Sequence, residues 1–135
     1  MLRTTYLGSL CLLVACTTTP VSSVHTYQAK LSAIQADIFL PSCANSYCHG
    51  GPSPAAGLAL DGTHVYDVLV HVPATDPSSP KWARVIPGAL DKSMIYQVLS
   101  HGVGQTQRMP AASGALEQDK IDAIGQWISA GALDN

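Results

Sequence analysis

The sequence predicts an all-α protein in which about four short helices are joined by long loops. Apolar residues recur in four separate segments at intervals of three and four residues, the spacing that is typical of helices. Stretches rich in glycine, proline and serine separate these segments, and the alternation that indicates strands is short wherever it occurs. No internal repeat is present, and 135 residues suit one domain.

Two helices are expected in the first half of the chain. The first lies within residues 26–40, and Pro41 is expected to end it. Its apolar stripe consists of Leu31, Ile34 and Ile38. The second lies within residues 61–72, with Thr63 as a possible N-cap. Its apolar side consists of Val65, Leu69 and Val72. Residues 50–57, GGPSPAAG, indicate a loop between the two helices.

Two further helices are expected in the second half. Asp91 is expected to open the first of them, and Gly102 to end it at the C′ position. The last helix has the clearest pattern, because Glu117 and Asp119 lie where they favour the positive end of the helix dipole and Gly131 follows the apolar residues. Those apolar residues are Ile121, Ile124 and Ile128.

The N-terminal residues indicate export from the cytoplasm. Arg3 precedes a mostly apolar run that is too short to span a bilayer, a pattern typical of a secretory signal. Residues 13–16, LVAC, resemble a bacterial lipobox. We therefore expect residues 1–15 to be a lipoprotein signal peptide, and Cys16 to carry the lipid that anchors the protein to a membrane. An ordinary secretory signal with an incidental cysteine is the alternative.

Residues 16–27 are polar and β-branched, and they predict a flexible tether before a folded domain over residues 28–135. Thr17 stands where many lipoproteins of the inner membrane carry aspartate, which mildly favours the outer membrane, with the domain facing the periplasm or the cell surface. The formal net charge is −2 at pH 7 and no basic patch is present, so nucleic acid is not an expected partner.

The segment CANSYCHGG, residues 43–51, carries the chemistry. Outside the cytoplasm free thiols rarely persist, so Cys43 and Cys48 are bonded either to each other or to another group. Covalent haem needs two thiols for its vinyl groups and an imidazole for its iron, and His49 directly follows the second cysteine. The spacer has four residues instead of the usual two, and its small residues tolerate the bulge that this requires.

A low-spin haem iron needs a second axial ligand. The side chains that could supply it are Met94, Met109, His64, His71 and His101. Met109 is favoured because it lies in a loop before the last helix and is followed by the stiff Pro110. Met94 lies within an expected helix, where core packing is the commoner role, and His101 lies at a helix end.

These features resemble the class I cytochrome c domain, in particular the small cytochrome-c-like domains of bacterial lipoproteins. The likeness is carried by CANSYCHGG, by RMP at residues 108–110 and by the closing KIDAIGQWISAGA, and it covers residues 28–135. It implies a bundle of about four short helices around one haem c, with thioethers at Cys43 and Cys48. His49 would be the proximal iron ligand and Met109 the distal one. The resemblance also implies a monomeric electron carrier, not an enzyme, that serves redox partner proteins of the cell envelope.

Two other interpretations remain open. In the first, the protein is a haem-free lipoprotein in which a Cys43–Cys48 disulfide stabilises a binding or scaffold module. In the second, it is an open-site haem protein that binds a gas or reduces peroxide. Structural zinc fits poorly because no second cysteine pair completes a tetrahedral site. The motifs of serine hydrolases, zinc proteases and phosphate-binding loops are absent from the sequence.

Overall fold

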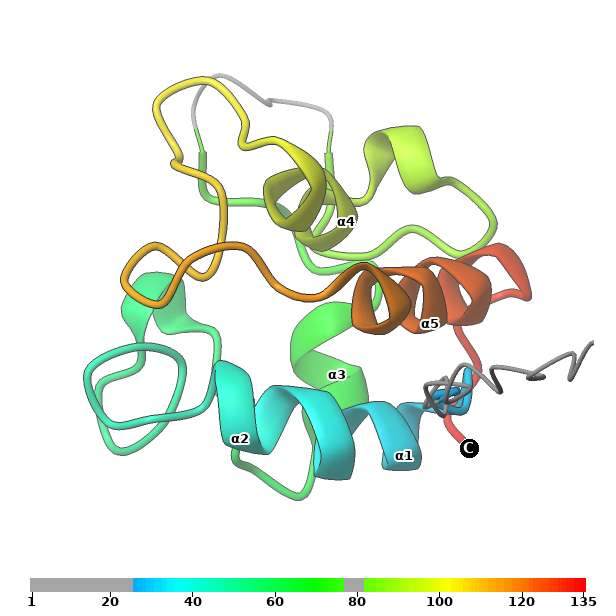
Figure 1. The fold of residues 1–135 in the computed structure, drawn as a ribbon, viewed down its shortest axis with the longest axis horizontal. Helices are drawn as coiled ribbons and strands as arrows, with labels where there is room; N and C mark the ends of the chain where they lie inside the picture. Colours follow the sequence, from blue (N-terminus) through cyan, green and yellow to red (C-terminus); the bar gives the residue numbers. More distant parts are fainter. Residues whose placement is uncertain (1–25, 77–81) are drawn as a thin grey trace, which may run out of the picture.

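A computed structural model describes residues 26–76 and 82–135, and in these residues the chain is helical, with isolated β-bridges but no strand (Figure 1). The first helix is continuous through three parts, namely α1 (Leu31–Ile34), the π-helical η1 (Gln35–Phe39) and α2 (Leu40–Ser42). The other helices are α3 (Val65–Leu69), α4 (Met94–Ser100) and α5 (Gln118–Ser129). The short 3₁₀ turns are η2 (Ala55–Gly57) and η3 (Leu90–Lys92). The predicted all-α class is therefore confirmed for these residues.

The expected signal peptide, the lipidation site Cys16 and most of the tether lie outside the described residues. Within the expected tether, Tyr27 already packs against the hydrophobic core, and the Nζ atom of Lys120 lies 5.6 Å from the centre of its ring. The last tether residue thus takes part in the folded domain.

The first helix follows the predicted stripe but passes the predicted end. Leu31, Ile34 and Ile38 are all buried. The prediction that Pro41 ends the helix is wrong, because α2 continues to Ser42. Pro41 directly follows the widened turns of η1 and lies one residue before the helix ends, where the regular α-helical pattern that excludes proline is already interrupted.

The π-helical segment η1 lies immediately before the segment that carries the cysteines. The N–H of Leu40 donates to the carbonyl of Gln35, and the N–H of Ala44 donates to that of Phe39, both over five residues. Such widened turns recur in α-helices at functional sites. Here the segment affects the direction in which residues 43 onward leave the helix.

The expected boundaries of the middle helices need correction. His64, and not Thr63, is the N-cap of α3, and Val72 lies beyond the end of this helix. Helix α4 begins at Met94, whereas Asp91 belongs to η3. The cause is Ser93, which is fully buried and holds the chain extended between the two elements.

The predicted ends of the last two helices are confirmed. Gly102 and Gly131 follow α4 and α5 with φ angles of 86° and 104°, in the left-handed region that favours glycine. Helix α5 packs between the first helix and α4 (Figure 1). Its Trp127 is 1% exposed and donates its indole N–H to the carbonyl of Leu133 at 2.8 Å. A Cβ atom at Gly125 would lie 2.8 Å from the ring of Tyr96, so this glycine permits the close approach of α4.

Two isolated bridges join the chain after α3 to residues 83–85, and a third joins Ala83 to Ser93, directly before α4. Val70 pairs with Val85, Pro73 with Ala83, and Ala83 with Ser93. Residues 83–86 are thereby held between two neighbouring segments, and Ser93 in one of them fixes the position of the N-terminus of α4.

We predict that Ser93→Ala destabilises the fold by about 1–3 kcal/mol, because it leaves the partly buried N–H of Ile86 without its acceptor. The Ser93 hydroxyl accepts a hydrogen bond from that N–H at 2.9 Å and lies 2.7 Å from the carbonyl of Ala89. Urea unfolding gives the free energy of unfolding.

Ser100→Ala is the matched control. Its hydroxyl only donates to the carbonyl of Tyr96 within the same helix, at 2.8 Å. We expect a change below about 1 kcal/mol there. An equal loss in both variants would contradict the role assigned to Ser93.

Candidate functional site

The site is a mostly apolar cavity of about 380 Å³, within the range of small-molecule and cofactor pockets, about 300–1,000 Å³. Its lining residues come mostly from the loops that follow the first helix, α3 and α4, and from α4 itself. Its apolar walls include Phe39, Leu58, Leu60, Ile95, Val98 and Leu99. Cys43, His49 and Met109 line the same cavity, so the structure brings together three of the four residues predicted for a haem site.

The segment between the cysteines folds into a compact loop. The carbonyl of Asn45 accepts hydrogen bonds from the N–H groups of Cys48 at 3.0 Å and Gly50 at 3.1 Å, and the N–H of His49 donates to the carbonyl of Cys43 at 3.0 Å. A Cβ atom at Gly50 would lie 2.1 Å from the carbonyl oxygen of Ala44, so only glycine fits there. Backbone hydrogen bonds thus hold the four residues between the cysteines in a closed loop.

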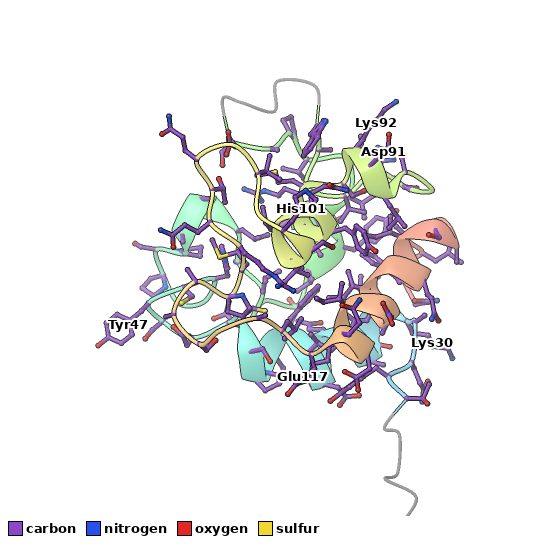
Figure 2. All side chains as sticks on the ribbon, turned by 45° about the horizontal axis from the view of Figure 1, so that its top comes forward. Lys30, Tyr47, Asp91, Lys92, His101 and Glu117 are labelled. Carbon is purple, nitrogen blue, oxygen red and sulfur yellow. The ribbon has the colours of Figure 1, made fainter. Side chains whose placement is uncertain are left out.

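Tyr47 lies at the outer side of this loop. Its side chain is 95% exposed and points away from the molecule (Figure 2). The Tyr47 ring is therefore not part of the cavity wall.

Both cysteines of the loop are free thiols in the structure, and both are partly buried. Cys43 lines the cavity, whereas Cys48 is not among the lining residues. Burial, together with the neighbouring Cys48, raises the pKa of the Cys43 thiol to about 11. The Cys43 thiol is therefore neutral at physiological pH, as suits a group in an apolar wall.

The imidazole of His49 is oriented by the loop that follows it. Its Nδ1 lies 3.1 Å from the carbonyl oxygen of Ala55. A carbonyl can only accept, so this contact places a proton on Nδ1 and leaves the lone pair of the neutral ring on Nε2. A metal-binding histidine typically has this arrangement, in which the second nitrogen donates to a backbone carbonyl.

The structure separates the candidates for the second axial ligand into two groups. Met109 lies in the loop after α4, packs against the core and is held by a hydrogen bond from its N–H to the carbonyl of Val98 at 2.8 Å. Met94 also lines the cavity, from α4 itself. The three histidines His64, His71 and His101 do not line it. His64 is instead an exposed residue beside Asp67, and His101 is the exposed C-cap of α4.

Arg84 also lines the cavity, and the sequence interpretation missed it. Its guanidinium donates from Nη1 to the carbonyl of Val68 at 2.8 Å and from Nη2 to the carbonyl of Ala56 at 2.6 Å. Burial lowers the pKa of the guanidinium. A charged residue within the apolar run WARVIP was the available signal, but nothing local to Arg84 identifies a carbonyl 28 positions away.

A polar contact lies at another part of the cavity wall. The hydroxyl of Thr106 donates to the carboxylate of Asp76, which links the loop after α4 to the segment after α3. In the part of the chain that the structure describes, no group of three or more His, Cys, Asp or Glu residues could hold a metal ion.

Comparisons with protein-family models, with curated protein sequences and with solved structures found no match for this chain. None of the helices in residues 26–76 and 82–135 has the length and apolar character needed to cross a membrane.

We predict that the haem-free protein loses stability between about pH 9 and pH 11. Folded Cys43 holds its proton more tightly than the unfolded thiol, whose pKa is 9.0. Its contribution is therefore fully present below pH 9 and is lost as the pH rises through about 11, up to about 2–3 kcal/mol.

Urea unfolding across this range, compared with Cys43→Ala, isolates the contribution of the thiol from those of lysine and tyrosine. Equal pH dependence in the two proteins would show that Cys43 is not protected in this way.

Proposed function

We propose that this protein is a c-type cytochrome that carries electrons in the bacterial cell envelope on a single haem. The supporting observation is that Cys43 and His49, from one short segment, line the same apolar cavity as Met109, which lies sixty positions after His49 in the chain. Covalent attachment requires two thiols, of which Cys43 lines the cavity and Cys48 lies in the adjoining loop, and an imidazole and a thioether are ligands that haem iron takes. The donor set and the apolar lining therefore fit haem c.

In this proposal Cys43 and Cys48 hold the haem through thioethers, and His49 is the proximal ligand. Burial raises the pKa of Cys43, so haem attachment would take place at a protonated thiol in an apolar wall. Bound haem supplies an iron that cycles between the ferrous and ferric states. The protein keeps its ligands in place during that cycle, and the hydrogen bond from His49 to Ala55 holds the ring orientation.

Met109 is the proposed distal ligand. Its backbone is tied to α4, and its partly buried side chain lines the cavity from a loop. Methionine ligation favours a higher reduction potential than a second histidine. The mostly apolar lining suits outer-sphere electron transfer, in which the surroundings of the iron rearrange little.

The proposed setting follows from the N-terminal sequence. A lipid on Cys16 would tether the domain to a membrane, with the outer membrane mildly preferred. The domain would act as a monomer that meets redox partner proteins of the envelope. The haem-free scaffold with a Cys43–Cys48 disulfide is the competing outcome in the experiments below.

The full chain, matured in a bacterial periplasm with c-type maturation genes, is expected to contain covalent haem. A haem-stained denaturing gel and a pyridine haemochrome spectrum report haem content and the number of thioethers. Cys43→Ser and Cys48→Ser should each retain at most one thioether, and the double variant none. Colourless protein with a disulfide between Cys43 and Cys48 would refute the cytochrome proposal and support the haem-free scaffold.

Met109→Ala is expected to abolish the low-spin methionine-ligated spectrum and to lower the reduction potential, because the iron loses its thioether ligand. Met94→Leu is the matched comparison, since Met94 lines the same cavity and its removal should preserve methionine ligation. The opposite pattern would assign the ligand to Met94. An unchanged spectrum in both variants would indicate an open-site haem protein.

A further inference from the structure

The turn that accepts the His49 hydrogen bond is conformationally demanding. Ala56, in η2, has a φ of 55°, in the left-handed region that side chains other than glycine rarely adopt. Such a conformation persists only where the surrounding structure holds it. The carbonyl of Ala55, which faces the His49 ring, belongs to the same turn.

Arg84 is the side chain that holds this turn from the other side of the cavity. Its Nη2 donates to the carbonyl of Ala56 at 2.6 Å, and the same nitrogen lies 3.8 Å from a Cβ built at Gly57. A charged donor makes a stronger hydrogen bond than a neutral one; the bond to Ala56 is exposed, whereas the bond from the same guanidinium to Val68 is partly buried.

Arg84 is itself fixed through both its side chain and its backbone. Nη1 donates to the carbonyl of Val68 near the end of α3. The N–H of Arg84 donates to the carbonyl of Val72 at 2.7 Å, and its carbonyl accepts from the N–H of Ile95 in α4 at 3.1 Å. Arg84 therefore connects the turn near His49 to the framework that carries α4.

We propose that Arg84 is a positioning residue for His49. By holding the carbonyl of Ala56, it fixes the adjacent carbonyl of Ala55, and with it the orientation and protonated nitrogen of the His49 ring. The orienting role applies to the polypeptide with or without haem, and its effect on a reduction potential rests on the function proposed above.

The geometry predicts that lysine cannot replace arginine here. The two carbonyls of Val68 and Ala56 are held by two nitrogens of one planar fork, whereas an ammonium is a single donor centre on a flexible stem. Arg84→Lys keeps the positive charge, so it separates the loss of geometry from the loss of charge. Arg84→Met removes both.

The test follows the Nδ1 proton of His49 by NMR on the full chain as purified, reduced with dithionite and labelled with ¹⁵N. We expect a protected Nδ1–H in the parent protein and, in Arg84→Lys and Arg84→Met, exchange with solvent that is faster by about tenfold or more. Arg108→Lys is the control, because its guanidinium Nε likewise donates to a backbone carbonyl, that of Leu99 at 2.9 Å, but does not contact this turn. It should leave the His49 proton unchanged.

Unchanged exchange in folded Arg84→Lys and Arg84→Met would overturn the proposal, and so would equal acceleration in Arg108→Lys. Far-UV circular dichroism and urea unfolding establish that each variant is folded. In haem-loaded protein the reduction potential of Arg84→Lys should also rise, because an imidazole without its hydrogen bond donates less to ferric iron. Colourless protein would refute the cytochrome proposal, while the exchange measurement would still decide the role of Arg84.

Discussion

The hydrogen bond between the His49 ring and the carbonyl of Ala55 is the contact on which the chemistry of the site depends. It decides which nitrogen carries the proton and therefore which one keeps a lone pair for a ligand. The contact in turn depends on a turn that contains a left-handed alanine and is held by Arg84. The local conformation around a single imidazole is thus supported from a segment more than thirty positions further along the chain.

The cavity lining comes from two parts of the fold that are held in different ways. The loop of residues 43–50 is closed by its own backbone hydrogen bonds, so this part is largely built from local contacts. The part that includes α4 and Met109 depends on bridges between distant segments and on the buried hydroxyl of Ser93. Helix α5 packs against both the first helix and α4, with Trp127 fully inside. A small domain with a cavity of this size has a thin core, which a covalently attached apolar group would strengthen.

The helices could be predicted from the sequence because apolar periodicity is a local signal: the stripes of the first and last helices are buried as expected, and two glycines end α4 and α5. The errors fall where distant contacts decide. Asp91 does not open α4 because Ser93 is bound to Ile86, and Pro41 lies inside a helix because a π-helical segment precedes it. Likewise, sequence motifs identified Cys43, His49 and Met109 as residues of the site. Arg84 was missed because its contact is a hydrogen bond to the backbone carbonyl of Ala56, which no motif marks.

The π-helical segment Gln35–Phe39 has a consequence for how this chain tolerates change in length. An α-helix turns by about 100° for each residue, so removing one residue from the widened turn would rotate everything after it by that amount relative to the buried stripe. Cys43 would then face a different direction while Leu31 and Ile34 kept their places. Single-residue deletions are usually most harmful in the middle of a helix. Here a deletion would yield a regular helix with its hydrogen bonds intact, and its effect would be a changed orientation of the segment that carries the cysteines.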